Sequence, residues 1–168
     1  MGSKAIKTPT AAPADAPRAR SLVRLANLDE LDILVGFQLD SALELENLRL
    51  DEGTVAAAMR AIFAHPTRGH YWIIAEGLQL QGMLLTSPEW SDWRNSAVLW
   101  IRSVYVRPEA RGRGLFRQFY EFLQELVRND PDLHGLRLYV DRPNKAAQQV
   151  YQAMGMTGGN YELYEWLA

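Results

Sequence analysis

The segment Leu138 to Met156, LYVDRPNKAAQQVYQAMGM, limits the possible folds more than any other part of the chain. It begins with an apolar run that is typical of a short buried strand, and Pro143 ends that run. Asn144 then stands where a helix N-cap belongs. Spacings of three, four and four put four residues on one stripe of a helix: Asn144, Ala147, Tyr151 and Gly155. A core stripe normally carries Leu or Ile, so this one predicts a face against which a ligand lies.

A second strand-to-helix unit lies upstream, between Trp100 and Tyr120. Its strand pattern ends at Pro108, and an amphipathic helix is predicted from Leu115 to Val127. The turn between them reads Arg-Gly-Arg-Gly over residues 111–114. Glycines there let backbone N–H groups approach a ligand, and the helix N-terminus adds unpaired donors and partial positive charge. With two arginines, the turn predicts a cradle for a pyrophosphate.

Composition narrows the class of protein. A length of 168 residues predicts one domain, and 48% hydrophobic with 23% charged residues is ordinary for a water-soluble globule. The net charge of −2 argues against a nucleic acid as the main partner. The absence of cysteine excludes disulfides, thiolate metal sites and cysteine nucleophiles. No apolar run reaches the length of a membrane span and no secretory signal is visible, so we expect a cytoplasmic protein without a membrane partner.

The order of predicted elements gives the fold class. Residues 1–20 are expected to be a disordered lead, and residues 21–168 a single domain. The predicted strands are 21–25, 71–76, 80–86, 97–106, 136–140 and one near 160–167; the predicted helices are 28 into the forties, 52–64, 115–127 and 144–154, with a loop at 87–95. This order predicts a mixed α/β domain, with one sheet and helices on both faces.

The two motifs resemble the cofactor-binding motifs of the GNAT superfamily of acyl-CoA-dependent N-acyltransferases. The family cradle has Arg or Gln, two residues, Gly, one residue, and a small residue. Here Arg111 and Gly114 match that pattern, and Phe116 replaces the last small residue. The family's later motif matches the stripe that begins at Asn144, with Met156 in place of Phe.

The resemblance covers about residues 21–167 and implies an α/β (α+β) GNAT fold. That fold has a single mixed, mostly antiparallel sheet of about six to seven strands, with a splayed central parallel pair and helices on both faces. The splayed pair corresponds to 97–106 and 136–140, and acetyl-CoA is implied as the cosubstrate in the cleft between them. The implied cofactor-binding residues are Val104, Tyr105, Val106, Arg111, Gly112, Arg113, Gly114, Leu115, Phe116, Asn144 and Tyr151.

The resemblance also implies catalytic roles. Tyr151 matches the family's general acid, which would protonate the departing thiolate. Arg102 stands where many family members have a glutamate that acts as the general base, and arginine cannot act as a base at neutral pH. This departure suggests either deprotonation through water or a carboxylate from elsewhere in the chain. Among the carboxylates we prefer Glu46 as the catalytic base, with Glu44, Glu89 and Asp92 as rivals. The predicted acceptor-binding residues are Glu44, Glu46, Trp90 and Trp93.

Together these features predict an N-acetyltransferase that acts on a primary amine of a small molecule by direct attack in a ternary complex. A protein acetyltransferase acting on lysine or an N-terminus, and a non-catalytic acyl-CoA-binding module, are the alternatives. The three histidines, His65, His70 and His134, show no ligand-like grouping, so no metal is expected. The apolar C-terminal segment 161–167 is compatible with a homodimer.

Overall fold

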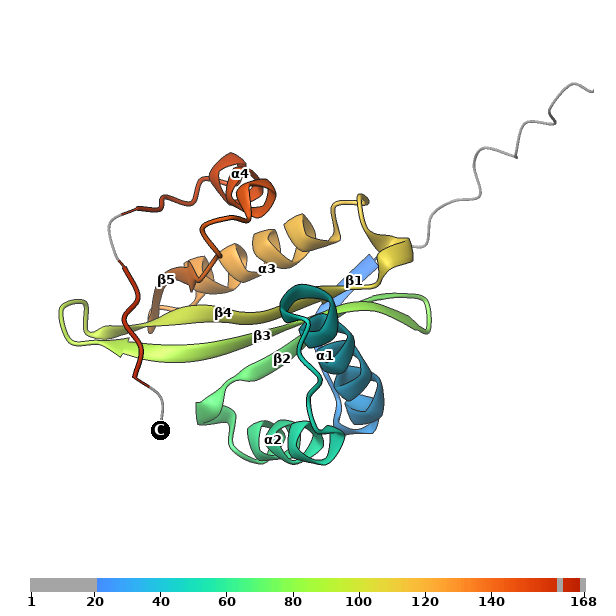
Figure 1. Cartoon of the computed structure of the whole chain (residues 1–168). Coiled ribbons are helices and arrows are strands. Elements are labelled where there is room, and N and C mark those ends of the chain that lie inside the picture. The colour runs from blue at the N-terminus through green and yellow to red at the C-terminus, as the bar shows by residue number, and fades with distance from the viewer. Residues whose placement is uncertain (1–20, 160–161, 167–168) are drawn as a thin grey trace, which may run out of the picture.

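The protein folds around one sheet that lies between two layers of helices (Figure 1). The structure is a computed structural model, and it describes residues 21–159 and 162–166. In these residues the strands run in sequence order: β1 (Ser21–Leu25), β2 (His70–Glu76), β3 (Gln79–Ser91), β4 (Ser96–Val106) and β5 (Leu133–Leu138). The first three pairings are antiparallel, and β4 runs parallel to β5. The predicted fold class is confirmed, with five strands in this part of the chain instead of six to seven.

The four α-helices divide between the two faces of the sheet. α1 (Leu31–Glu46) and α2 (Glu52–Ala64) lie on one face, and α3 (Leu115–Asn129) and α4 (Lys145–Ala153) lie on the other (Figure 1). Because strand side chains alternate, neighbouring residues of β2 enter different cores. Ile73 packs under α1 and α2, while Ile74 packs under α3. The sheet thus lies between two hydrophobic cores and contributes side chains to both of them.

Local chemistry fixes where the helices begin. The Asp51 side chain accepts hydrogen bonds from the Thr54 backbone N–H at 2.7 Å and from its hydroxyl at 2.8 Å, as expected of an N-cap. Asn144 caps α4 in the same way, accepting from the Ala147 N–H at 3.0 Å. α3 instead begins after Gly114, whose φ of +75° suits a residue without a side chain.

The parallel pairing of β4 with β5 ends before β4 does. The last pair in register is Ile101 with Leu138, the final residue of β5, after which β4 continues to Val106 paired with β3. On its other side, β4 advances three residues from Ile101 to Val104 while β3 advances only two, from Thr86 to Leu84. β4 therefore contains a bulge at residues 102–103, and a bulge bends its strand. The bulge thus lies directly after the last pair of the parallel strands, and beyond that pair the two segments no longer share a ladder, as the family resemblance implied for a splayed pair.

Some predicted boundaries are wrong. β3 extends through residues 87–91, because these residues pair with β4, so only the tip of the expected 87–95 loop is a turn. β5 spans 133–138 instead of 136–140, since pairing starts at Leu133 and ends at Leu138. Of the strand predicted near 160–167, residues 162–166 form no strand, and residues 160, 161 and 167 lie outside the described residues. The lead predicted at residues 1–20 also lies outside them. Within the described residues no helix has the length and apolarity needed to cross a membrane.

Gly82 provides a test of the contact between β3 and β4. A Cβ on Gly82 would lie 2.5 Å from the Tyr105 carbonyl oxygen, and a strand backbone cannot simply swing aside. We expect Gly82→Ala to lower the free energy of unfolding by about 1 to 3 kcal/mol, measured by urea denaturation. Gly135→Ala on β5, where a Cβ meets nothing within 4 Å, is the control and should cost less. Equal losses in both variants would contradict the assigned close approach.

Candidate active site

The sequence predicts a pyrophosphate cradle in the segment that comprises the end of β4, the turn after it and the start of α3. Gly112 and Gly114 have positive φ values of 71° and 75°, and neither has an atom within 4 Å of where a Cβ would stand. The first backbone hydrogen bond of α3 runs from the Gln118 N–H to the Gly114 carbonyl at 3.2 Å. The N–H groups of residues 115–117 therefore have no acceptor within the helix. These donors, with the helix dipole behind them, can bind an anion.

The two arginines of the cradle are held by carboxylates from other elements. Arg111 donates from both terminal nitrogens to Glu44 of α1, at 2.5 and 2.7 Å, and its Nε donates to the Val106 carbonyl at 2.9 Å. Arg113 is paired with Glu76 at the end of β2. The Arg111 guanidinium holds the pKa of Glu44 below its usual value. The arginines thus fix the turn to the sheet and to α1 while keeping the turn cationic.

Tyr151 lies directly against the start of α3. Its ring meets the Phe116 ring edge-on, with centroids 5.6 Å apart. The side chain is half-buried, and this burial raises the pKa of the phenol, which therefore stays protonated at neutral pH. Phe116, the residue that departs from the family pattern, thereby positions the predicted acid. Asn144, two stripe positions earlier, is exposed and its side-chain oxygen caps α4.

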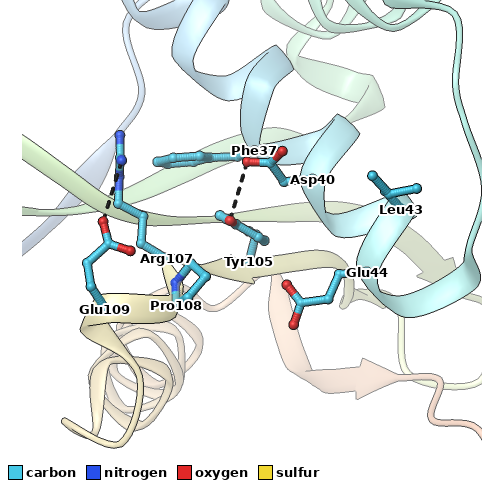
Figure 2. A pocket seen from close by; sticks show the side chains of 8 residues that line it. All are labelled: Phe37, Asp40, Leu43, Glu44, Tyr105, Arg107, Pro108 and Glu109. Carbon is cyan, nitrogen blue, oxygen red and sulfur yellow. Dashed lines mark hydrogen bonds and ion pairs between the residues drawn. The ribbon is translucent and has the colours of Figure 1, made fainter.

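A pocket of about 460 Å³ lies on the other face of the sheet, between α1 and the end of β4 (Figure 2). The Tyr105 hydroxyl points across it to Asp40, at 3.4 Å, and the Arg111 guanidinium lies over the Tyr105 ring at 5.8 Å. Desolvation, followed by the nearby Asp40 carboxylate, raises the pKa of Tyr105. The residues that line the pocket are Phe37, Asp40, Leu43, Glu44, Tyr105, Arg107, Pro108 and Glu109.

The predicted acceptor residues do not all come together. Glu44 lines the pocket, whereas Glu46 is exposed at the last turn of α1 and is not among the lining residues. Trp90 and Trp93 lie at the β3–β4 hairpin, 63% and 86% exposed, also outside that lining. Of the rival bases, Glu89 binds Trp100 and Arg137, and Asp92 accepts from the Trp93 backbone N–H in the hairpin turn.

The remaining predicted cofactor residues are placed as follows. Val104 and Val106 pack towards α3, Tyr105 faces α1, and Leu115 is buried in the core beneath α3.

Phe37 and Asp40 of the pocket were missed by the sequence analysis. Their spacing to Glu44, three and then four residues, puts all three on one face of α1 and was the available signal. Among residues 21–159 and 162–166, no group of three or more acidic or histidine side chains is placed to hold a metal ion.

The predicted acid and the pocket lie on opposite faces of the sheet, on either side of the region where the pairing of β4 with β5 ends. Tyr151 belongs to the layer of α3 and α4, while Asp40 belongs to α1 (Figure 1). Beyond Ile101 and Leu138 no strand pairing closes the sheet between these layers. This arrangement is the one that the motifs imply for an acyl-CoA-dependent transferase.

Comparisons with known proteins show the family and the fold. The model of the acetyltransferase (GNAT) family matches residues 39–156, and the chain belongs to this family. No curated protein matches the chain. A solved structure described as a possible acetyltransferase from Clostridium difficile 630 is 30% identical, with a TM-score of 0.84, over 88% of this chain and 97% of that one.

Two more distant structures share the fold. An aminoglycoside N-acetyltransferase, AAC(6')-Iy, in complex with CoA is 17% identical with a TM-score of 0.73, over 90% of this chain and 98% of that one. A ribosomal-protein-alanine N-acetyltransferase from Brucella melitensis biovar Abortus 2308 is 11% identical with a TM-score of 0.70, over 89% of this chain and all of that one. At these identities the likeness shows the architecture alone.

The burial of Tyr151 makes a prediction about its ionisation. We expect the phenol to titrate above its ordinary value of about 10, because burial disfavours the tyrosinate. The measurement is the tyrosinate ultraviolet absorbance as a function of pH, for wild type minus Tyr151→Phe. Tyr71→Phe is the reference, since burial raises the pKa of Tyr71 to about 12. A Tyr151 transition below pH 10 would show that the phenol is not enclosed by its neighbours.

Proposed function

We propose that the protein transfers an acetyl group from acetyl-CoA to the primary amine of a small molecule, by direct attack in a ternary complex. The observation that carries this proposal is the gap between β4 and β5. The protonated Tyr151 phenol lies on one face of the sheet and the carboxylate-lined pocket lies on the other face. Membership of the acetyltransferase family supports the acetyl donor.

The chain offers two kinds of partner for acetyl-CoA. In the described part of the chain, residues 102–106 of β4 pair with no strand on the β5 side, so their backbone groups there can pair with the amides of a pantetheine arm. The N–H groups at the start of α3 fit the pyrophosphate, because the open Cβ positions of Gly112 and Gly114 leave room for close approach. Together these contacts would orient the thioester along the gap.

The reaction joins the two faces of the sheet. The neutral amine attacks the thioester carbonyl carbon, so that a C–N bond forms and the C–S bond breaks. The electron pair of the broken bond leaves on sulfur, and Tyr151 donates its proton to that thiolate. The ammonium proton of the product goes to a base or to water. Holding both reactants in one cleft supplies much of the rate.

The acceptor amine would enter from the α1 side. Asp40 is a pocket carboxylate that forms no ion pair within the described residues, so it can attract a cationic amine or accept its proton. Glu44 is less suited to be a base, because Arg111 lowers its pKa. Glu46 as the base stays a prediction. Because Glu46 is exposed at the end of α1 and does not line the pocket, either α1 would have to move or the amine would have to bind outside the pocket.

Tyr151→Phe tests the acid directly. The variant keeps the ring contact with Phe116 but removes the proton, so kcat should fall about 10²- to 10⁴-fold while the Kd for CoA stays the same. The measurement is release of free CoA thiol, with acetyl-CoA and a panel of small amines as substrates. Tyr71→Phe, which removes a buried phenol from the other core, is the matched control and should keep full activity. Undiminished turnover by Tyr151→Phe would remove this residue from the mechanism.

Gly114 tests the cradle. Gly114→Ala places a side chain at φ +75° and should cost about 1 to 2 kcal/mol of stability. It should also shift the donors at the start of α3, weakening CoA binding about tenfold or more in calorimetry, as expected from loss of a hydrogen bond to a charged group. Gly77→Ala, at φ +61° in the β2–β3 turn and also free of nearby atoms, should cost similar stability and leave CoA affinity unchanged. If both variants bind CoA alike, the pyrophosphate lies elsewhere.

A further inference from the structure

An aromatic pair bridges β4 and β5 just where the two strands begin to separate. Trp100 of β4 stacks on Tyr139, the first residue after β5, with ring centroids 4.4 Å apart. Two guanidinium groups flank the indole, since Arg102 and Arg137 have their Cζ atoms 5.8 and 5.7 Å from its centroid. These distances are within the range of cation–π interactions. We call these four residues the Trp100 cluster.

The two arginines of the Trp100 cluster differ in their partners. Glu89 accepts from the Arg137 guanidinium at 2.6 Å and, through its other oxygen, from the Trp100 indole at 2.6 Å. Arg102 donates only its Nε, to the Ser87 hydroxyl at 3.0 Å. Within the described residues no carboxylate pairs with Arg102. The terminal nitrogens of this exposed guanidinium therefore have no acceptor within that part of the chain, while its Nε is fixed by Ser87.

The position of Arg102 places this charge beside the reaction. Ile101 and Leu138 face α3, so by strand alternation Trp100, Arg102 and Arg137 face the other side of the sheet. The bulge at residues 102–103 returns Tyr105 to that same side, where it lines the pocket. Arg102 and Tyr105 are three residues apart on one strand, or about 10 Å. The acceptor face thus has carboxylates at one end and an unneutralised guanidinium at the other.

We propose that Arg102, supported by Trp100, binds a carboxylate on the acceptor, so that the protein acetylates amines that also carry an acid group. The inference rests on the proposed function, because it assigns one end of that acceptor. A planar guanidinium with both terminal nitrogens available suits a carboxylate, which accepts two parallel hydrogen bonds. The Glu89–Arg137 pair keeps the neighbouring arginine from competing for the same anion. Arg102 acts as a specificity-determining residue and takes no part in proton transfer.

The test uses acceptors that differ only in the acid group. Glycine, β-alanine and γ-aminobutyrate are each compared with their carboxamides, and KM and kcat are measured by CoA thiol release. Wild type should prefer the acids. Arg102→Gln should raise KM for the acids about 10- to 100-fold, as expected for a lost hydrogen bond to a charged group, with little change for the carboxamides. Arg102→Lys, which keeps the charge but not the paired geometry, should fall between. Arg60→Gln, an exposed arginine of α2, is the matched control and should change neither series.

A binding measurement separates this inference from the proposed function. N-acetylglycine carries a carboxylate and no reactive amine, and it is titrated into the CoA-saturated protein while the indole N–H signal of Trp100 is followed by NMR. Saturable binding that Arg102→Gln abolishes supports the carboxylate subsite even if no amine is acetylated. Equal binding by wild type and Arg102→Gln, or an equal KM for acids in both proteins, would overturn it whether or not acetyl transfer occurs.

Discussion

The separation of β4 from β5 is the constraint on which the rest of the molecule depends. Up to Ile101 and Leu138 the two strands share a parallel ladder, and beyond that pair β4 continues to Val106 without its neighbour. The extra residue at 102–103 bends β4 and also changes which side chains face which core. Ile101 and Val104, an odd number of residues apart, both pack towards α3 as a result. The bulge at residues 102–103 therefore determines which face of the sheet each later side chain of β4 occupies.

The proposed pyrophosphate cradle combines charged side chains with backbone donors. Arg111 and Arg113 each have a carboxylate partner, one from α1 and one from the end of β2. Their ion pairs are partly exposed, so their contribution to stability is modest. Their larger effect is positional, because they join the turn to two elements that are distant in the sequence. Specific contacts to a pyrophosphate would then come mainly from the backbone, with the arginines adding positive potential.

The two faces of the sheet have different chemical characters. On the α3 and α4 face, burial keeps the Tyr151 phenol neutral beside Phe116. On the α1 face, carboxylates lie near the end of β4 and an arginine lies at its bend. The sheet thus separates the half-buried phenol from the charged side chains of the α1 face.

Sequence patterns gave the bounds of most elements, because short-range signals define them. Asp51 caps α2, the glycines start α3, and Asn144 caps α4, each at or within a residue of the predicted position. The loop predicted at 87–95 failed because Pro88 and the polar residues around it do not exclude pairing with β4. Contacts between Phe116 and Tyr151, and between Arg111 and Glu44, could not be predicted from spacing, since each joins residues at least 35 positions apart.

By itself, the sequence determined the order of the elements, the glycine turn before α3 and the stripe that carries Tyr151, since these follow from backbone conformation and helical periodicity. Only the tertiary structure decided which carboxylates line the pocket, which arginines are neutralised, and that Arg102 remains without a carboxylate partner among the described residues. Those outcomes depend on strand register and on the bulge in β4, and a single extra residue there reverses the face that every later side chain occupies.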